Sequence, residues 1–332
     1  MLTLGIETSC DETSVAVVQA DRRILSNVIL SQAEHERFGG VIPEVASRQH
    51  LKTIVPIYRQ ALSQAEKTLD DIELIAATMG PGLVGPLLVG LTFAKSLAFA
   101  RKLPFVPVNH LEGHLAANLL EHADLDSRHL TLIVSGGHTL LVKVESFGQY
   151  EILGQTKDDA AGEAFDKVAK LLGLGYPGGQ ALDRLARKGD AAYFRFPRAV
   201  MKQGYDFSYS GLKTAVAVHL QKLSDHDLRK HRADIAASFQ EAVVDVLVTK
   251  TVLAAQEHST RDITISGGVA ANSRLRVRMT EELKKRRKRL FYPSTPLCTD
   301  NAAMIAAAGF YSYETRGPGE LIANAIPYLR LT

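Results

Sequence analysis

Two histidines one helical turn apart are the first residues in this sequence that could do chemistry together. His110 and His114 lie in the segment NHLEGH, directly after the apolar residues 105–108. Residues four apart share one face of a helix, so both imidazoles can bind the same metal ion. Asn109 can cap this helix, and Glu112 can complete a capping box. The spacing predicts a metal site at a helix start, with two ordinary surface or core histidines as the alternative.

A metal site of this kind needs a third ligand, and Asp300 is the candidate. It stands just before the apolar residues 302–308, which are typical of a helix. The ordinary role of an aspartate there is to cap the helix. It can equally complete a two-histidine, one-carboxylate site that suits iron or zinc. The H-E-x-x-H protease motif does not match, because Leu111 follows the first histidine and Glu112 lies about 100° further around the helix.

Three glycine turns are candidates for nucleotide binding. Ser135-Gly136-Gly137 and Ser266-Gly267-Gly268 each follow an apolar strand, where backbone N–H groups can approach a phosphate. Simple hairpin turns are the alternative. The third turn, residues 80–85, fits G-x-G-x-x-G, but no acidic residue follows it before Glu112 to bind a ribose. We therefore interpret the third turn as tight packing of a helix on a strand.

The elements that must position these residues occur twice. Residues 3–18 and 130–144 both indicate a strand, a polar or glycine turn and a returning strand, and residues 263–268 indicate a further strand and turn. This pattern predicts a duplicated α/β fold of the actin-like ATPase type (ASKHA, ribonuclease H-like), with two lobes and a central cleft. We expect an N-terminal lobe at 1–108 and a C-terminal lobe at 109–332, with a helical and loop insertion around 150–225.

Composition excludes several classes of protein. The 332 residues are 46% hydrophobic and 23% charged, with a net charge of +3 and two cysteines, Cys10 and Cys298. That composition excludes disorder and a disulfide framework. Neither cysteine has a partnered base nearby, so we interpret both as structural. The start of the chain lacks a targeting signal and the apolar residues 83–100 indicate a buried helix, so we expect a cytoplasmic protein. The basic run 284–289 predicts a local contact with folded RNA, with a solvated helix end as the alternative.

Taken together, these segments resemble the bacterial TsaD/YgjD (Gcp) family. The matching stretches span most of the chain and are GIETSCDETSVAVV, GGVIPEVASRQH, GPGLVGPLLVG, PVNHLEGH, LIVSGGHT, DDAAGEAFDKVAKLLGLGYPGG, DFSYSGLKT, ISGGVAAN and CTDNAAMIA. The sequence departs from the family pattern at residues 326–330 and at Asn109, where relatives often have histidine. Neither departure touches the presumed metal ligands.

The resemblance implies a reaction and a set of site residues. The family transfers a threonylcarbamoyl group from threonylcarbamoyl-AMP to N6 of adenosine 37 in tRNAs that read codons beginning with A. The resemblance also implies that His110, His114 and Asp300 bind one divalent metal ion. Fe²⁺ is the expected ion, and Zn²⁺ is the alternative. The implied substrate contacts are Ile133, Val134, Ser135, Gly136, Gly137, Asp166, Gly179, Asp183 and Asn272. Asp166 and Asp183 would contact the ribose and Asn272 the adenine or ribose, while Asp11 or Glu12 would orient or deprotonate the amine.

The resemblance also implies tRNA as substrate and TsaB and TsaE as protein partners, with no membrane. Two other functions fit the predicted fold. A small-molecule kinase would need Mg–ATP and a base for an acceptor hydroxyl, but not the histidine pair. A nucleotide-dependent binding module would only assemble partners.

Overall fold

The computed structural model describes residues 1–20, 22–199 and 204–331, which form two compact units. The first unit contains Met1–Ser127, Ser146–Tyr150 and Pro293–Thr332, and the second contains Arg128–Glu145 and Glu151–Tyr292. This division differs from the predicted boundary after residue 108. The reason is that helices α3 (His110–Glu121) and α10 (Ala302–Arg316) pack in the core of the first unit.

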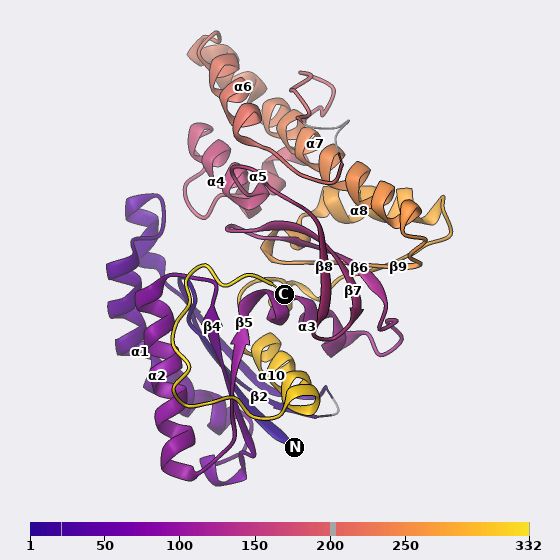
Figure 1. Cartoon of the computed structure of the whole chain (residues 1–332). Coiled ribbons are helices and arrows are strands. Elements are labelled where there is room, and N and C mark those ends of the chain that lie inside the picture. Colours follow the sequence, from indigo (N-terminus) through magenta and orange to yellow (C-terminus); the bar gives the residue numbers. More distant parts are fainter. Residues whose placement is uncertain (21, 200–203, 332) are drawn as a thin grey trace. The chain divides into compact units, whose positions relative to one another are not determined.

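A five-stranded mixed sheet forms the centre of the first unit (Figure 1). Its central strand β1 pairs antiparallel with β2 and parallel with β4, so the predicted opening hairpin is confirmed. β2 pairs antiparallel with β3, and β4 pairs parallel with β5. In sheet order the strands are β3 (Ile24–Ser31), β2 (Glu12–Gln19), β1 (Leu2–Glu7), β4 (Leu74–Gly80) and β5 (Phe105–Asn109).

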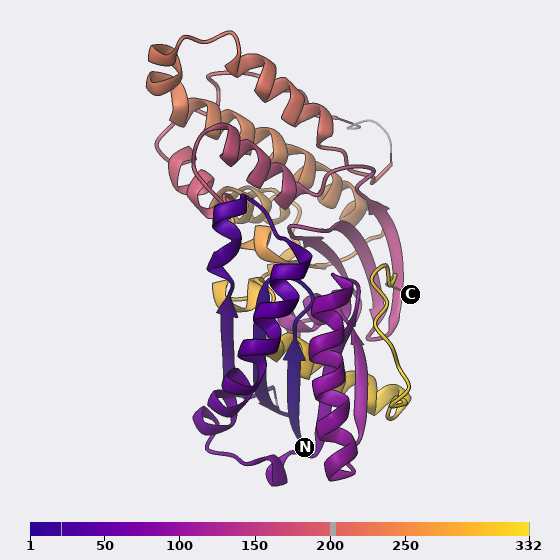
Figure 2. The ribbon, with the colours of Figure 1, turned by 90° about the vertical axis from the view of Figure 1, so that its left-hand side faces the viewer.

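Side chains of this sheet alternate between two helical layers. On β2, Val15 and Val17 pack in the cluster that includes helices α1 (Pro43–Gln64) and α2 (Val84–Arg101). Ala16 and Val18 point to the other face and pack with α10. Figure 2 shows α1 and α2 lying over the strands. The period of two along a strand therefore builds two cores, one on each face of one sheet.

Helix α10 lies unusually close to the sheet because the strand beneath it carries a glycine. A Cβ on Gly5 would stand 2.2 Å from the carbonyl oxygen of Ala302 and 2.7 Å from the nitrogen of Ala306. Seven successive residues of the helix, 302–308, are buried. Any side chain at Gly5 would push the start of α10 away from β1.

Helix α2 is long and apolar enough to cross a bilayer, by its length and composition alone. One face of it, including Leu87, Leu91 and Ala94, is buried in the first unit, where the helix packs against α1 and β4. The buried helix that the sequence predicts is therefore present for one face only, because Val84, Leu88 and Phe99 are exposed.

The C-terminal residues 317–331, which we call the strap, run back along the first unit. Gly319 N donates to Phe105 O at 2.7 Å, and Ile326 N donates to Met79 O at 2.9 Å. Near its end, the carbonyl of Arg330 accepts a 2.9 Å hydrogen bond from the side chain of Asn109. The strap is thus fixed to the ends of β4 and β5 by backbone hydrogen bonds.

The second unit is built on another five-stranded sheet with an equivalent strand order. Its central strand β6 pairs antiparallel with β7 and parallel with β9, as β1 does with β2 and β4. The predicted hairpin at 130–144 is therefore confirmed. In sheet order the strands are β10 (Arg289–Phe291), β9 (Asp262–Ser266), β6 (His129–Val134), β7 (Thr139–Ser146) and β8 (Gln149–Gln155).

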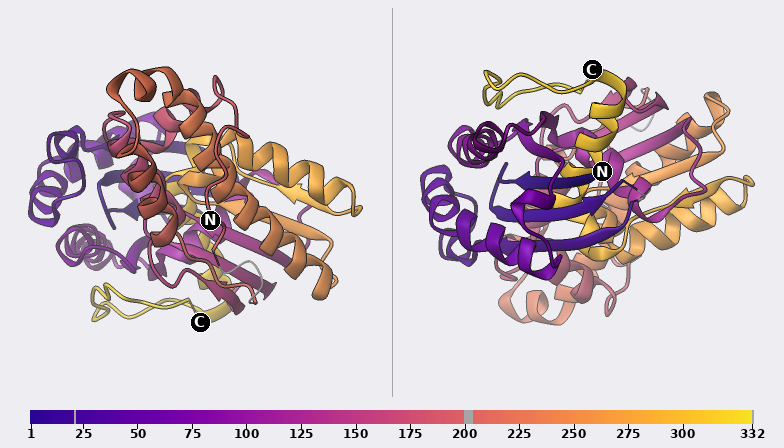
Figure 3. Two further views of the ribbon diagram at one scale, coloured as in Figure 1. Left: turned by 90° about the horizontal axis from the view of Figure 1, so that it is seen from above. Right: turned by 90° about the horizontal axis from the view of Figure 1, so that it is seen from below.

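Helices make up the rest of the second unit. A 33-residue helix, α7 (Asp225–Glu257), packs against α5 and α8, and Figure 3 shows α7 and α8 side by side. The remaining helices are α4 (Ala161–Leu171), α5 (Gly179–Ala186), α6 (Ser210–Leu220) and α8 (Ser273–Lys284). Helices α4, α5 and α6 account for most of the predicted insertion at 150–225.

Candidate functional site

His110, His114 and Asp300 come together in the first unit. One ligand atom from each lies within 4.8 Å of the other two. The Nε2 atoms of both histidines stand 3.4 Å from the same oxygen, Oδ1 of Asp300. His114 is fully buried, and neither of its ring nitrogens makes a hydrogen bond to the described part of the chain. A buried imidazole left without hydrogen bonds is costly, and a divalent metal held by these three side chains would satisfy it.

Local capping explains how the sequence places these ligands. Asn109 ends β5, and its side chain accepts a hydrogen bond from Leu111 N at 2.9 Å, so α3 begins at His110. The capping prediction for Asn109 is confirmed. The predicted capping box is wrong, because Glu112 pairs with Arg316 at 3.2 Å instead.

The helix-capping role that was the alternative for Asp300 is filled by the next residue. Asn301 is the N-cap of α10, and its Oδ1 accepts from Met304 N at 3.0 Å. Asp300 therefore lies just outside the helix, and its carboxylate faces the histidines.

A buried carboxylate behind His110 completes the centre. Oε2 of Glu7 lies 2.9 Å from Nδ1 of His110, and the hydroxyl of Thr78 donates to the same oxygen at 2.7 Å. Metal-binding histidines characteristically donate their second N–H to a carboxylate, which orients the ring and fixes its tautomer. Glu7 accepts the hydrogen bond of Nδ1–H of His110 in this way, so the other ring nitrogen, Nε2, faces Asp300. Sequence reasoning missed Glu7; an acid within an apolar strand was the available signal.

The electrostatics of the centre suit a cation. Burial alone would lower the pKa of His110, but the charges of Asp300 and Glu7 outweigh it and raise that pKa well above its usual value. Burial opposes ionisation of Asp300, yet its two histidine neighbours hold its pKa well below the usual range. Burial lowers the pKa of His114. The carboxylates of Asp300 and Glu7 thus favour a positive charge on His110, and a bound metal can take the place of that charge.

The predicted catalytic acids lie in the same unit, at the turn between β1 and β2. Burial, followed by the charges of Asp11 and Asp300, raises the pKa of Glu12 well above its usual value. A cation at Asp300 would remove part of that repulsion. Burial and the charges of Asp11, Asp300 and Glu12 also raise the pKa of the Cys10 thiol, so it is neutral at pH 7 and a poor nucleophile.

The predicted donor contacts lie in the second unit and form a connected series. Ile133 and Val134 are buried at the end of β6, and the turn that follows is closed by a 2.8 Å hydrogen bond from Ser135 N to His138 O. Gly136 and Gly137 are exposed, and a Cβ added to either would meet nothing within 4 Å. The turn itself therefore does not need glycine at these two positions.

Helices α4 and α5 continue the series. Gly162 N donates to Ser135 O at 3.1 Å, which places the start of α4 beside the turn. One turn along α4, Oδ1 of Asp166 accepts from the backbone nitrogens of Gly178 and Gly179 at 2.8 and 3.2 Å. Asp166 thereby fixes the first turn of α5, the helix that carries Asp183.

The last two predicted contacts are engaged with the protein. Oδ1 of Asp183 accepts from the hydroxyl of Ser273 at 2.7 Å, and Oδ2 pairs with Arg187 at 2.7 Å. Asn272 caps α8 through Leu275 N at 3.0 Å, and its amide donates to Gln240 at 2.7 Å. The predicted residues of the second unit are therefore neighbours, but their side chains already hold the ends of α5 and α8.

The remaining sequence motifs have structural roles. In the turn at residues 80–85, a Cβ on Gly82 would stand 2.6 Å from Ser9 O, and a Cβ on Gly85 would stand 2.2 Å from the hydroxyl of Ser47. These distances support the packing interpretation of this motif.

The basic run is partly engaged with the rest of the second unit. Lys285 and Arg286 pair with Glu282, Arg289 pairs with Asp262, and Nζ of Lys288 donates to the carbonyls of Ala255 and Thr260. Lys284 and Arg287 are exposed and form no ion pair in the described part of the chain. The engaged side chains fit the alternative of a solvated helix end.

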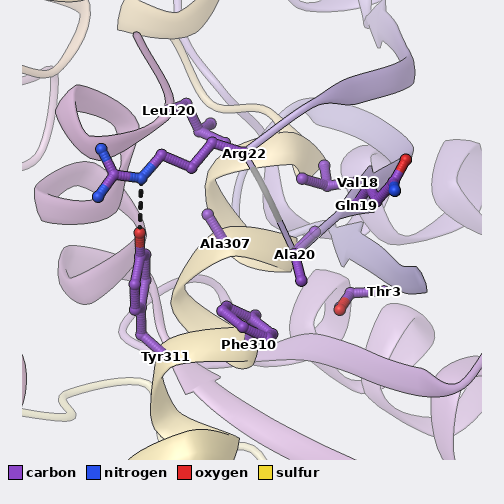
Figure 4. A pocket seen from close by; sticks show the side chains of 10 residues that line it. Thr3, Val18, Gln19, Ala20, Arg22, Leu120, Ala307, Phe310 and Tyr311 are labelled. Atoms are coloured by element: carbon purple, nitrogen blue, oxygen red, sulfur yellow. Dashed lines mark hydrogen bonds between the residues drawn. The ribbon is translucent and has the colours of Figure 1, made fainter. Parts of the chain in front are cut away.

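A small pocket elsewhere in the first unit lacks the predicted site residues. Figure 4 shows Arg22 reaching across it, with its Nε donating to the hydroxyl of Tyr311 at 3.1 Å. Its lining is mostly apolar, and includes Val18, Leu120 and Phe310. We assign it to imperfect packing between α10 and the sheet.

Solved structures of other proteins share the fold. Component A of (R)-2-hydroxyglutaryl-CoA dehydratase from Acidaminococcus fermentans superposes with a TM-score of 0.60 at 17% identity, covering 95% of this chain and 98% of that one. HypF from T. kodakarensis superposes with a TM-score of 0.64 at 16% identity, covering 94% of this chain and 48% of that one. At these identities the likeness concerns the fold alone.

Sequence relatives are much closer. The tRNA N6-adenosine threonylcarbamoyltransferase of Caldicellulosiruptor saccharolyticus is 49% identical over 332 residues, which is all of this chain and 98% of the relative. The protein of the same name from Clostridioides difficile is 50% identical over 335 aligned positions, with the same coverage. The model of the TsaD family, tRNA N6-adenosine threonylcarbamoyltransferase, matches residues 23–307. With most of its length matched by that model and its whole length matched by such relatives, this chain belongs to the TsaD family.

Proposed function

We propose that this protein transfers the threonylcarbamoyl group from threonylcarbamoyl-AMP to N6 of adenosine 37 in tRNAs that read codons beginning with A, a reaction that forms t⁶A. The observation that carries the proposal is the buried group of His110, His114 and Asp300, in a chain about half identical over its full length to enzymes named for this transfer. The donor is a mixed carbamic–phosphoric anhydride, which is already activated, so no covalent enzyme intermediate is required.

In the transfer, N6 attacks the carbamoyl carbon, the bond from that carbon to the phosphate oxygen breaks, AMP leaves, and the amine loses a proton. His110, His114 and Asp300 would hold one divalent metal, with Fe²⁺ proposed first and Zn²⁺ second, and Glu7 would orient His110. When bound, the metal would supply Lewis-acid polarisation of the donor oxygens. Because an exocyclic amine is a weak nucleophile, positioning by the protein should contribute most of the rate.

The second unit is proposed to bind the donor. The backbone from Ile133 to Gly137 would hold the phosphate, and the open space around Gly137 supports this. Asp166, Gly179 and Asp183 would bind the ribose side of the nucleotide. Since Asp183 and Asn272 already bond to Ser273 and Gln240, their contacts to ligand would have to use remaining lone pairs and N–H groups or exchange partners.

Asp11 or Glu12 is proposed to orient or deprotonate N6. Support comes from the charge of Asp300 acting on Glu12, which couples this carboxyl electrostatically to the metal ligands. Cation binding at Asp300 would lower the pKa of Glu12 and so favour its carboxylate form, which can accept the proton of the amine.

At the level of the fold, we propose that the chain is a duplicated actin-like ATPase (ASKHA, ribonuclease H-like), with halves at 1–108 and 109–332 and an insertion around 150–225. The equivalent strand order of the two sheets supports this duplication. We further propose a cytoplasmic enzyme that works with TsaB and TsaE. A small-molecule kinase of this fold would have no use for a buried histidine pair, so we favour the transferase.

A single-turnover assay tests the proposal. The purified protein, loaded with Fe²⁺ or Zn²⁺, is mixed with threonylcarbamoyl-AMP and an unmodified tRNA transcript, and the digested nucleosides are analysed by mass spectrometry. We expect t⁶A from the normal transcript and none from a transcript with guanosine at position 37. ATP-dependent phosphorylation of a small molecule, or binding of the donor with no transfer, would refute the transferase.

A further inference from the structure

Two stretches of this chain are strongly basic. Residues 184–234 contain eleven Lys and Arg against five Asp and Glu, a net charge of +6, and residues 274–289 contain nine against two, a net charge of +7. In the second stretch Arg274, Arg278, Lys285, Arg286 and Arg289 pair with acids. A near-neutral protein with strongly basic regions has the electrostatic pattern of a local polyanion contact, so the first stretch is the candidate to consider.

The cations of this stretch are exposed and the acids are engaged. Within the described part of this stretch, six exposed cations form no ion pair, and we call them the basic surface: Arg184, Lys188, Arg195, Lys222, Arg229 and Lys230. Four of the five acids accept hydrogen bonds or pair with cations, namely Asp190, Asp206, Asp227 and Asp234. With all five acids counted, the stretch still carries a net charge of +6.

Ring contacts hold these cations in one neighbourhood of the second unit. The Tyr193 ring stacks on His231 of α7 at 4.5 Å, and the Phe194 ring lies 4.1 Å from His219 of α6. Gly189 lies so close to α7 that a Cβ would stand 2.1 Å from Ala233 O. The loop at 188–196 is thus held against the last turn of α6 and the first turns of α7, which Figure 1 shows joined by a short connection.

An exposed aromatic ring lies among these charges. Phe194 is 37% exposed and precedes Arg195. Phosphates of an unpaired RNA loop bind cations, and splayed bases stack on aromatic rings, so this combination suits RNA. An acidic protein surface would use the charges but would not need the ring.

The basic surface also starts on the helix proposed to bind the donor. Helix α5 carries Gly179 near its start and Asp183 in its middle, and Lys188 follows its end. Eight helical residues span only about 12 Å. An RNA whose adenosine must meet the donor would therefore have phosphates within reach of Lys188.

We propose that the basic surface binds the phosphate backbone of the acceptor tRNA and that Phe194 stacks on one of its bases. The inference rests on the proposed function, and it replaces the run at 284–289 as the site of RNA contact.

The test compares two variants that lose the same charge. One is K188Q/K222Q/R229Q/K230Q, and the matched control is K284Q/K285Q/R286Q/R287Q in the run at 284–289, where Lys285 and Arg286 pair with Glu282. The affinity for an unmodified tRNA transcript is measured between 50 and 200 mM KCl, alongside thermal melting and AMP affinity. We expect the first variant to bind tRNA at least tenfold more weakly, with a salt slope smaller by about three, since each of the four lost phosphate contacts removes roughly 0.7–0.9. The control should behave as the parent.

The aromatic part is tested by F194A against F194L. We expect F194A to lose roughly tenfold in tRNA affinity with an unchanged salt slope, because stacking involves no counterion release. Unchanged tRNA affinity in the basic-surface variant, or an equal loss in the control, would overturn the inference. The single-turnover assay separates the two proposals. If the parent protein makes t⁶A and the basic-surface variant binds tRNA as tightly as the parent, only the proposed tRNA-binding surface is refuted. If the variant loses tRNA affinity but the parent makes no t⁶A, only the proposed function is refuted.

Discussion

Replacing Gly137 by alanine should weaken donor binding without destabilising the protein. No atom of the described structure lies within 4 Å of the added Cβ, and the backbone of Gly137 is outside the left-handed region. Gly267 offers a matched control on the neighbouring turn. Its φ is +88°, and an added Cβ would stand 2.4 Å from Val134 O. The two substitutions therefore separate a glycine that the ligand needs from a glycine that the fold needs.

The expected magnitudes follow from these geometries. Gly137→Ala should leave stability unchanged or raise it by about 0.4–1 kcal/mol, because alanine restricts the unfolded chain. Gly267→Ala forces an unfavourable backbone conformation that costs about 1–3 kcal/mol before the overlap with Val134 is counted. For a unit of this size each kcal/mol lowers Tm by about 2–4 °C. Crowding the approach of the phosphate to Gly137 should remove a charge-assisted hydrogen bond of about 1.5–3 kcal/mol, which is roughly 10- to 150-fold in affinity.

Thermal melting and titration with a non-reactive analogue of the donor, on the same samples, measure both quantities. We expect Gly137→Ala to melt with the parent and to bind the analogue at least tenfold more weakly, and its metal content should be that of the parent. Gly267→Ala should melt several degrees lower. Parental affinity for the analogue in a stable Gly137→Ala protein would refute the phosphate assignment, and so would a Gly137→Ala protein that melts as low as Gly267→Ala.

Three further predictions concern the metal centre and the second unit. The double change of His110 and His114 to alanine should abolish stoichiometric metal by elemental analysis while circular dichroism stays that of the parent, and full metal occupancy in the folded variant would contradict the ligand set. Glu7→Gln keeps the size of the side chain but removes the carboxylate behind His110, so metal affinity by competition titration should fall about 10- to 100-fold; an unchanged affinity would leave Glu7 a packing residue. Burial opposes ionisation of Asp158, but hydrogen bonds from residues 208–210 hold its pKa below the usual 3.8. The ionised carboxylate therefore stabilises the fold at pH 7, and this stabilisation disappears as the pH falls below about 4 and through the pKa of Asp158 in the folded protein. Asp158→Asn should therefore melt below the parent at pH 7, and the difference should shrink as the pH falls below about 4; a difference that does not change with pH would argue against this role.

Local patterns predicted elements in both units. Residues 3–18 and 130–144 predicted the two hairpins that the structure contains. The spacing of His110 and His114 predicted that the two side chains lie together on one helix face, and they do. These features depend on residues a few positions apart, so the sequence shows them directly.

Long-range features escaped prediction for a physical reason. Glu7 meets His110 only because β1 lies beside β4 and β4 beside β5, and no short pattern encodes that neighbourhood. Helix α7 has a polar first part and a second part buried on most sides, so it has no single apolar stripe by which its full length could be recognised. The partners of the run at 284–289 include Asp262, on a strand that precedes the run. Which cations of a basic run pair with acids therefore depends on the fold and cannot be seen in the run itself.

The first unit is made from both ends of the chain, and this has a consequence for the order in which the protein matures. A ribosome delivers His110 and His114 early, then the whole second unit up to Tyr292, and Asp300 and α10 almost last. Until α10 emerges, the face of β1 that carries Gly5 has no cover, and the two histidines have no carboxylate to share. The second unit is synthesised in full before Asp300, so the three proposed metal-binding side chains can meet only when the chain is nearly complete. If they hold the ion as proposed, metal loading would report completion, because a product shortened by its last three dozen residues would keep both histidines and lack Asp300.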